Sequence, residues 1–184
     1  MVLDQLAALS QNCQPTGDRY LDDLFERDKT ALYYRYLHRV SQLLGPSQIV
    51  ELGVYNAWST AHFAAPSPLS AVFAVDPAPQ SGFRAVTDRY PNIKVVLDRS
   101  DNQAVLNMFP SHSLDICFID TIHEYEQATR EISLWAPKMR TGGIFFLDDI
   151  DLNSGMRRFW TEVPFPKASL PWLHFSGFGI AVVC

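Results

Sequence analysis

Short apolar runs alternate with longer, more polar stretches from residue 49 onwards, and no other feature of this 184-residue sequence constrains the fold as strongly. The apolar runs are too short for helices and rich in Val, Ile and Phe, which is typical of buried strands. They lie at residues 49–52, 71–75, 93–97, 114–119 and 144–147. Helices are expected between them, at residues 59–65, 82–90, 104–108 and 124–135. Because strands that alternate with helices form a parallel sheet covered on both faces, the pattern predicts a doubly wound α/β fold.

The first 45 residues are predicted to be helical. Helices are expected at residues 2–10 and 20–44, and Gly45-Pro46 ends the second one. The second helix carries more apolar side chains than one buried face requires. They are Leu32, Tyr33, Tyr34, Tyr36 and Leu37. We interpret residues 1–45 either as a lid over the ligand site or as a contact in a homo-oligomer, and the sequence leaves both open.

The C-terminal residues do not follow the strand–helix alternation. A last helix is expected at residues 156–163, followed by two strands at 172–175 and 178–183 that are separated only by Ser176-Gly177. Strands joined by so short a link pair antiparallel, since a parallel pair needs a long crossover. The predicted fold is therefore a single α/β domain over residues 1–184, with a mostly parallel sheet and an antiparallel C-terminal edge hairpin.

The composition excludes several classes of partner. Fifteen Lys and Arg against twenty Asp and Glu leave a net charge of −5, and no basic run is present, which argues against a nucleic-acid binder. No run approaches the roughly 20 apolar residues that a membrane span needs, and the N-terminus lacks the pattern of a signal peptide. Cys13, Cys117 and Cys184 form neither a disulfide framework nor a metal motif, so a cytoplasmic location is expected.

Acidic residues follow every one of the five predicted strands. Carboxyl ends of parallel strands meet at one edge of a sheet, where ligands of such folds bind. The acidic residues are Glu51, Asp76, Asp98, Asp120, and the pair Asp148-Asp149. A single such residue is commonly a helix cap, but several carboxylates on one rim repel each other unless a cation lies among them. The sequence therefore predicts a site for positively charged ligands.

The turn after the first strand narrows the choice of cofactor. A dinucleotide site needs several glycines there, so that backbone amides meet a pyrophosphate. This chain has Glu51-Leu52-Gly53-Val54-Tyr55-Asn56-Ala57, with one glycine and a carboxylate. A phosphate is repelled at such a turn, whereas a ligand with an ammonium and a sulfonium group is attracted.

These residues resemble the class I S-adenosylmethionine (SAM)-dependent methyltransferases, which have a Rossmann-like fold. Within that class they are most similar to the metal-dependent O-methyltransferases of the catechol and macrocin types. The resemblance runs from residue 49 to the C-terminus. It is carried by Glu51 to Ser59, Val75-Asp76-Pro77, Leu114 to Asp120, Thr121 to Glu126, and Gly142 to Asp149. A cephalosporin-hydroxylase-like branch has similar motifs, so the family alone does not fix the reaction.

The resemblance implies a role for each cofactor-binding residue. Gly53 lets the cofactor approach the backbone, and Glu51, Tyr55 and Ser59 line the methionine end. Asp76 accepts the ribose hydroxyls. Ser100 and Asp101 lie near the adenine, and Asp120 borders both cofactor and metal. The sequence departs from the family at Ala57, where a second glycine is usual, and this departure puts tight cofactor binding in question.

The resemblance also implies a metal site and a base. Asp120, Asp148 and Asp149 match the ligands of a divalent cation such as Mg²⁺, which prefers oxygen donors. His123 stands where the macrocin type has a catalytic base, and an unperturbed imidazole pKa of about 6.5 suits that role. The remaining histidines show no partner at ligand spacing and are expected at the surface or in the core. They are His38, His62, His112 and His174.

The expected function is transfer of a methyl group from SAM to a hydroxyl of a small molecule, with Mg²⁺ holding the hydroxyl. Two alternatives stay open: a metal-independent methyltransferase of the same fold, and a non-catalytic domain that binds a ligand or acts as a scaffold.

Overall fold

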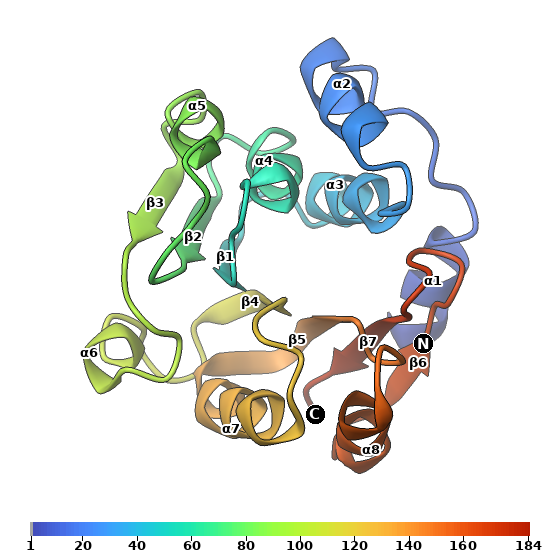
Figure 1. Ribbon diagram of the computed structural model, residues 1–184, viewed down its shortest axis with the longest axis vertical. Coiled ribbons are helices and arrows are strands. Elements are labelled where there is room, and N and C mark those ends of the chain that lie inside the picture. Colours follow the sequence, from blue (N-terminus) through green and yellow to red (C-terminus); the bar gives the residue numbers. More distant parts are fainter. Residues whose placement is uncertain (1) are drawn as a thin grey trace.

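A central sheet of seven strands organises the computed structural model, which describes residues 2–184 (Figure 1). The strands follow the order β3-β2-β1-β4-β5-β7-β6 across the sheet. Their bounds are β1 Gln48–Leu52, β2 Ala71–Val75, β3 Ile93–Val96, β4 Leu114–Ile119, β5 Met139–Asp148, β6 Lys167–Ser169 and β7 Phe178–Val182. Strands β1 to β5 are parallel, whereas β7 pairs antiparallel with both β5 and β6. The predicted fold class, mostly parallel with an antiparallel C-terminal edge, is confirmed.

The chain reverses its direction of winding between β1 and β4. From β1 it proceeds outward to β2 and β3, then returns to place β4 on the other side of β1. The loops after β1 and β4 consequently diverge above the sheet, and folds of this kind bind ligands at that point. The topology therefore marks the ends of β1 and β4 as the place to search for a site.

Helices cover both faces of the sheet (Figure 1). Helices α3, α4 and α5 lie on one face with α2 outside them, whereas α6, α7 and α8 lie on the other, and α1 packs beside β6 and β7. The bounds are α1 Val2–Leu9, α2 Arg19–Arg27, α3 Tyr33–Leu44, α4 Trp58–Ala64, α5 Phe83–Thr87, α6 Gln103–Leu106, α7 Tyr125–Trp135, the 3₁₀ turn η1 Ala136–Lys138, and α8 Ser154–Glu162. No helix among residues 2–184 has the length and apolar character needed to cross a membrane.

Alternate side chains of the central strands supply the two halves of the core. On β4, Phe118 packs towards α3 and α4 whereas Cys117 packs towards α7, because successive strand residues point to opposite faces. Cys117 is fully buried, as expected for a small core residue. Both faces of the central strands β1 and β4 are buried, which explains why these strands are largely apolar runs in the sequence.

The predicted helix at residues 20–44 is wrong in one respect, because two helices occupy this stretch. Helix α2 ends at Arg27, and Asp28 then accepts hydrogen bonds from the amide (3.3 Å) and the hydroxyl (2.6 Å) of Thr30. This local bonding competes with the helix, and α3 restarts at Tyr33. Most of the apolar side chains of α3 pack in the chain's own core, whereas Leu43 and Leu44 are exposed.

The predicted strand at residues 172–175 is also wrong, since these residues lie in a loop. The antiparallel partner of β7 is β6, at Lys167–Ser169. After β6 the chain forms a turn, in which the Leu173 amide donates a hydrogen bond to the Leu170 carbonyl at 3.0 Å. The side chain of Trp172 donates from Nε1 to the Ser10 carbonyl at 3.2 Å. This loop, residues 170–177, returns the chain to the carboxyl end of β5.

Candidate active site

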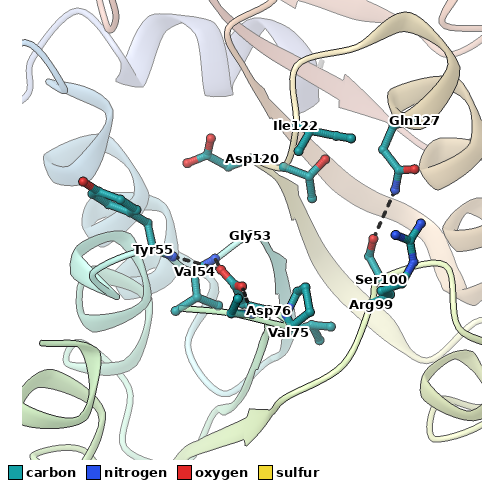
Figure 2. Close-up of a pocket in the computed structure, with 13 residues that line it drawn as sticks. Gly53, Val54, Tyr55, Val75, Asp76, Arg99, Ser100, Asp120, Ile122 and Gln127 are labelled. Atoms are coloured by element: carbon teal, nitrogen blue, oxygen red, sulfur yellow. Dashed lines mark hydrogen bonds between the residues drawn. The ribbon is translucent and has the colours of Figure 1, made fainter. Parts of the chain in front are cut away.

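Two adjacent cavities lie at the carboxyl ends of the central strands. The first, called here the β2 cavity, has a volume of about 280 Å³ and lies over the ends of β1, β2 and β3 (Figure 2). The second, called the acidic cavity, has a volume of about 300 Å³ and extends over β4 and β5 towards α3. Residues Val54, Tyr55, Asp120 and Thr121 line both. A ligand that crosses this shared wall can therefore place one end in each cavity.

Gly53 is required by the close approach of two loops. Its φ of +84° lies in the region that favours glycine, and a Cβ there would stand 1.9 Å from the carbonyl oxygen of Asp120. The resemblance implies that Gly53 lets a cofactor approach the backbone. The structure adds a packing reason: only glycine lets the β1 loop lie against the end of β4.

Asp76, at the end of β2, holds the loop after β1 in place. Its Oδ2 accepts hydrogen bonds from the amides of Val54 (2.8 Å) and Tyr55 (3.2 Å), and its Oδ1 accepts one from the Ala78 amide at 2.8 Å. Figure 2 shows this carboxylate at the floor of the β2 cavity. Two carboxylate oxygens have about four acceptor positions, so Asp76 keeps capacity for a further donor from the cavity.

Glu51 lies beneath the acidic cavity and lines neither cavity itself. It is fully buried and accepts hydrogen bonds from the hydroxyls of Ser59 and Thr60 on α4. Burial raises the pKa of Glu51 to about 8, although the two hydroxyls oppose this. Ser59 does line the acidic cavity, so Glu51 acts on the cavity through Ser59.

The turn between β1 and α4 adopts left-handed backbone conformations. Tyr55 has φ 47° and its side chain is 65% exposed at the mouth shared by the two cavities. Ala57 has φ 61° and is fully buried. Glycine adopts this conformation without strain, so the position of Ala57 has the geometry for which the family uses glycine.

Ser100, which follows β3, belongs to a buried hydrogen-bond network at the far wall of the β2 cavity. Its hydroxyl donates to Glu131 of α7, which also accepts from Thr121 Oγ1 at 2.8 Å and from Gln127 Nε2 at 2.9 Å. The sequence analysis missed Glu131. Its signal was a carboxylate on the otherwise apolar face of α7 formed by Ala128, Ile132 and Trp135.

Asp98 does not join the predicted acidic rim, and Asp101, which was expected near the adenine, lines neither cavity. Asp98 accepts from Asn102 Nδ2 at 2.8 Å, and the two oxygens of Asp101 accept from Nε and Nη2 of Arg99, both at 2.8 Å. This pairing with Arg99 lowers the pKa of Asp101. Neither residue lines either cavity, so the expectation that Asp101 lies beside a bound base finds no support in its position.

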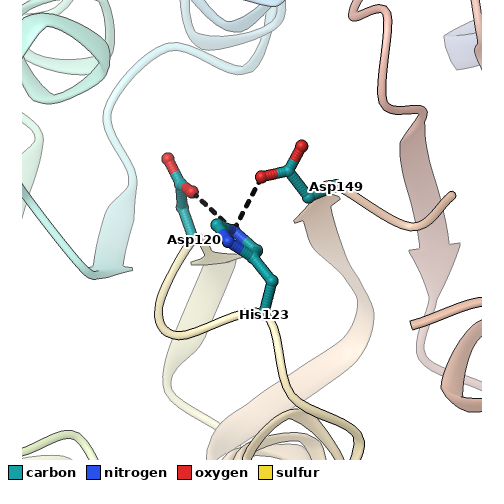
Figure 3. Close-up of side chains that lie close together, drawn as sticks. All are labelled: Asp120, His123 and Asp149. Carbon is teal, nitrogen blue, oxygen red and sulfur yellow. Dashed lines mark hydrogen bonds and ion pairs between the residues drawn. The ribbon is translucent and has the colours of Figure 1, made fainter. Parts of the chain in front are cut away.

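His123 lies between two carboxylates at the edge of the acidic cavity (Figure 3). Its Nε2 is 3.2 Å from Asp120 Oδ1, at the end of β4, and 3.0 Å from Asp149 Oδ2, at the end of β5. Burial lowers the pKa of His123, but its bonds to both carboxylates outweigh this and raise the pKa to about 10. In this arrangement the imidazole is protonated at neutral pH, contrary to the expected pKa near 6.5.

His174 is a residue of this site, and its placement at the surface or in the core was a wrong expectation. The loop at residues 170–177 brings its Nδ1 to 2.7 Å from Asp148 Oδ1 and 3.6 Å from Asp149 Oδ1. Asp149 also accepts from the hydroxyl of Ser176. Burial raises the pKa of Asp148, and the neighbouring carboxylates raise that of His174 despite its burial. His62, by contrast, is buried in the core as expected, and burial lowers its pKa to about 4.

The donor atoms fit a divalent cation. Asp120, His123 and Asp149 place one ligand atom each within 4.8 Å of one another, and so do Asp148, Asp149 and His174. Asp149 belongs to both groups. The carboxylates suit Mg²⁺, while imidazole nitrogens also suit softer ions. The same carboxylates are balanced by the two imidazoles, so the cluster is compatible with an ion without requiring one.

Comparison with family models identifies residues 50–150 as a methyltransferase domain. The matched segment contains β1 to β5 and most of the lining residues of both cavities. None of the curated proteins compared with the chain matches it.

Solved structures with the same fold include several methyltransferases. An O-methyltransferase from Bacillus cereus in complex with SAH is 19% identical, covers all of both chains and has a TM-score of 0.71. The SAH-bound methyltransferase PaMTH1 from Podospora anserina is 15% identical over 98% of this chain and 95% of its own, with a TM-score of 0.73. Cofactor-bound Rv0187 from MTB is 18% identical over 99% of this chain and 89% of its own, with a TM-score of 0.70. At these identities the likeness concerns the fold.

Proposed function

Because this chain belongs to the methyltransferase-domain family, we propose that it transfers a methyl group from SAM to a hydroxyl of a small molecule, aided by a divalent cation such as Mg²⁺. The observation that carries the proposal is the shared wall between the two cavities. Asp120 and Thr121 line both cavities. On one side lies the β2 cavity, lined by apolar and hydroxyl side chains, and on the other lies the cluster of carboxylates and imidazoles at the acidic cavity. Donor and acceptor of a methyl group can meet across this wall.

The β2 cavity is the proposed site of the adenosine half of SAM. Asp76 retains acceptor capacity for the ribose hydroxyls, and Ser100 lies at the opposite wall for the base. Tyr55 and Ser59 lie towards the acidic cavity, where the methionine half would extend, with Glu51 behind Ser59. The related folds with bound SAH support this assignment.

The acidic cavity is the proposed site of the hydroxyl substrate and the cation. Asp120, Asp148 and Asp149 would hold the ion. A divalent cation bound there lowers the pKa of a coordinated hydroxyl and fixes its orientation. SAM supplies an electrophilic methyl group, so the chain's own contribution is to align the two oxygens and the methyl and to exclude water. Tyr33 and Tyr34, buried on α3, line the same cavity together with Asp28, which precedes α3.

His123 is the proposed base, on the condition that its imidazole first loses the proton that the neighbouring carboxylates stabilise. The protonated imidazole can accept a proton only after losing the one that Asp120 and Asp149 stabilise. Removing those carboxylates from the imidazole lowers its pKa, because burial then acts unopposed, and a base works best when its pKa is not far above the working pH. The base role therefore depends on the carboxylates being engaged elsewhere.

A second candidate is a metal-independent methyltransferase of the same fold. The contacts of His123 and His174 with the three carboxylates favour it, because the imidazoles supply partners to the cluster without an ion. In that case the imidazoles orient the substrate hydroxyl, and the carboxylates orient the imidazoles.

Production of SAH from SAM separates the candidates. The chelator-treated protein is incubated with SAM and a panel of catechols, simple phenols and sugars, with and without Mg²⁺ or Mn²⁺. Turnover of a vicinal diol that requires the ion supports the first candidate, and equal turnover in chelator supports the second. Failure of SAM and SAH to bind in calorimetry would contradict both and favour a scaffold.

A further inference from the structure

A buried carboxylate that the proposed reaction does not use organises one wall of the β2 cavity. Glu131 of α7 is 0% exposed and accepts hydrogen bonds from three side chains that line the cavity. These are Ser100 through Oγ, Thr121 through Oγ1 at 2.8 Å, and Gln127 through Nε2 at 2.9 Å. The donors come from three separate segments, namely the loops after β3 and β4 and helix α7.

This network determines which atoms the wall offers to a ligand. A hydroxyl carries a single hydrogen, and both Ser100 and Thr121 direct theirs to Glu131, so only their lone pairs remain. Gln127 directs Nε2 to Glu131 and towards Ser100 Oγ at 3.4 Å (Figure 2), which leaves Oε1 as its free polar atom. Trp135 donates from Nε1 to the carbonyl of Ser100 at 3.1 Å and so holds that segment.

Arg99 is the one basic side chain that lines the cavity among the described residues, and two of its five N–H donors are engaged by Asp101. Its Nε and Nη2 both point to Asp101 at 2.8 Å, and its side chain is 65% exposed. The side chains of Ser100, Thr121 and Gln127 therefore form a wall of hydrogen-bond acceptors.

We propose that Glu131 is a positioning residue that sets the base specificity of the cofactor site. By holding the hydrogens of Ser100, Thr121 and Gln127, it makes the wall accept the 6-amino group of adenine and reject a 6-oxo purine. An amino group donates two hydrogens to such a wall, whereas a carbonyl oxygen faces acceptors and leaves buried groups unpaired. The inference rests on the proposed binding of an adenosyl cofactor in this cavity.

Calorimetry with two ligands tests the inference: S-adenosylhomocysteine and its 6-oxo counterpart, S-inosylhomocysteine. The wild-type chain is expected to bind the adenosyl ligand about 10²-fold more tightly. In Glu131→Gln, the amide donates where a carboxylate oxygen accepted, so one neighbouring hydroxyl turns its hydrogen into the cavity. We expect the ratio of the two dissociation constants to fall about 10-fold. Glu126→Gln makes the same change on the exposed side of α7 and is expected to leave the ratio unchanged.

Ser100→Ala is measured in parallel, because it removes one acceptor without touching Glu131. It is expected to weaken adenosyl binding and to leave inosyl binding within about twofold. A wild-type ratio in either folded variant overturns the inference, as does equal binding of the two ligands by the wild type. If the wild type binds neither ligand, the proposed function fails as well, which is a distinguishable result.

Discussion

The two cavities hold their carboxylates by different means. In the β2 cavity, Asp76 is held by backbone amides, and Glu131 by two hydroxyls and an amide. In the acidic cavity, Asp148 and Asp149 are held largely by the imidazoles of His174 and His123. Backbone amides and hydroxyls do not titrate near neutral pH, whereas the imidazole of His123 is a titratable group with a pKa of about 10. The β2 cavity is therefore a fixed binding surface, and the acidic cavity is a titratable one.

The largest expected effect comes from the acidic cavity. Asp120→Asn and Asp148→Asn are each expected to reduce methyl transfer on the order of 10³-fold, since each removes a charge worth several kcal/mol to a bound cation. Binding of S-adenosylhomocysteine should change little in Asp148→Asn. The measurement is the initial rate of SAH formation.

Asp98→Asn is the matched control, because Asp98 also follows a strand but lines neither cavity. Its rate is expected to stay within about twofold of wild type. Equal losses in Asp98→Asn and Asp148→Asn would contradict the distinction between the cavity and the acids outside it.

Divalent ions are expected to stabilise only chains with an intact acidic cavity. At a concentration 100 times the dissociation constant, a ligand adds about 2.7 kcal/mol to the free energy of unfolding, which corresponds to roughly 5–10 °C in melting temperature for a chain of this size. Differential scanning calorimetry with Mg²⁺ and Mn²⁺ measures this. Asp149→Asn should abolish the shift and Glu131→Gln should keep it. A shift that survives Asp149→Asn would place the ion elsewhere.

The pH dependence of the free energy of unfolding distinguishes the titration of the buried acid Glu51 from that of His123, which lies between two carboxylates. The pKa of Glu51 is about 8 in the fold against 4.5 for the free side chain, so the folded state holds the extra proton in between. Stability is then present below pH 4.5 and falls towards pH 8, by at most about 1.4 kcal/mol per pH unit. For His123 the corresponding loss runs from pH 6.5 to about 10.

Denaturant unfolding across pH 5–10 checks these two intervals. Glu51→Gln is expected to reduce the decline in the lower interval, to which the raised pKa of Asp148 also contributes, and to leave the upper one. His123→Gln is expected to remove the decline in the upper interval and leave the lower one. A decline that both variants retain in full would contradict the assignment of these titrations.

The smallest effect is expected at Ala57. Ala57→Gly relieves a left-handed backbone, at a gain of about 1–2 kcal/mol, but it loses a buried methyl and makes the unfolded chain more flexible, which together cost a similar amount. We therefore expect the free energy of unfolding to change by less than about 1 kcal/mol. Ala57→Val, with a branched Cβ in the same conformation, is expected to destabilise by several kcal/mol, and equal values for the two variants would contradict a strained turn.

The sequence predicted the central parallel strands well, because β1, β4 and the second half of β5 are buried on both faces and are therefore largely apolar runs. It did not reveal β6, whose three residues, Lys167–Ser169, carry no such pattern. The apolar residues of the following loop, including Trp172 and Leu173, have a sequence pattern that is typical of a strand. In the structure they pack against the N-terminal segment and the core. Which residues form a short edge strand was decided by tertiary contacts.

The site was predicted in part, for a related reason. Asp120, Asp148 and Asp149 come together because the ends of adjacent parallel strands must meet. Asp98 obeys the same rule at its strand but is held by Asn102, a local contact that strand positions do not reveal. The sequence did not predict His174 as a site residue, because the loop at residues 170–177, after β6, brings it to Asp148 at the end of β5. Position along a strand predicts which residues gather, whereas local partners decide which of them face the cavity.

A crystal structure with S-adenosylhomocysteine tests the central claim most directly, which is that the methyl donor spans the wall between the two cavities. The account predicts the adenosine in the β2 cavity, its ribose hydroxyls at Asp76, and its sulfur beside Asp120 and Tyr55, facing the acidic cavity. A nucleoside bound among the carboxylates of the acidic cavity, or a sulfur that faces away from them, would contradict it.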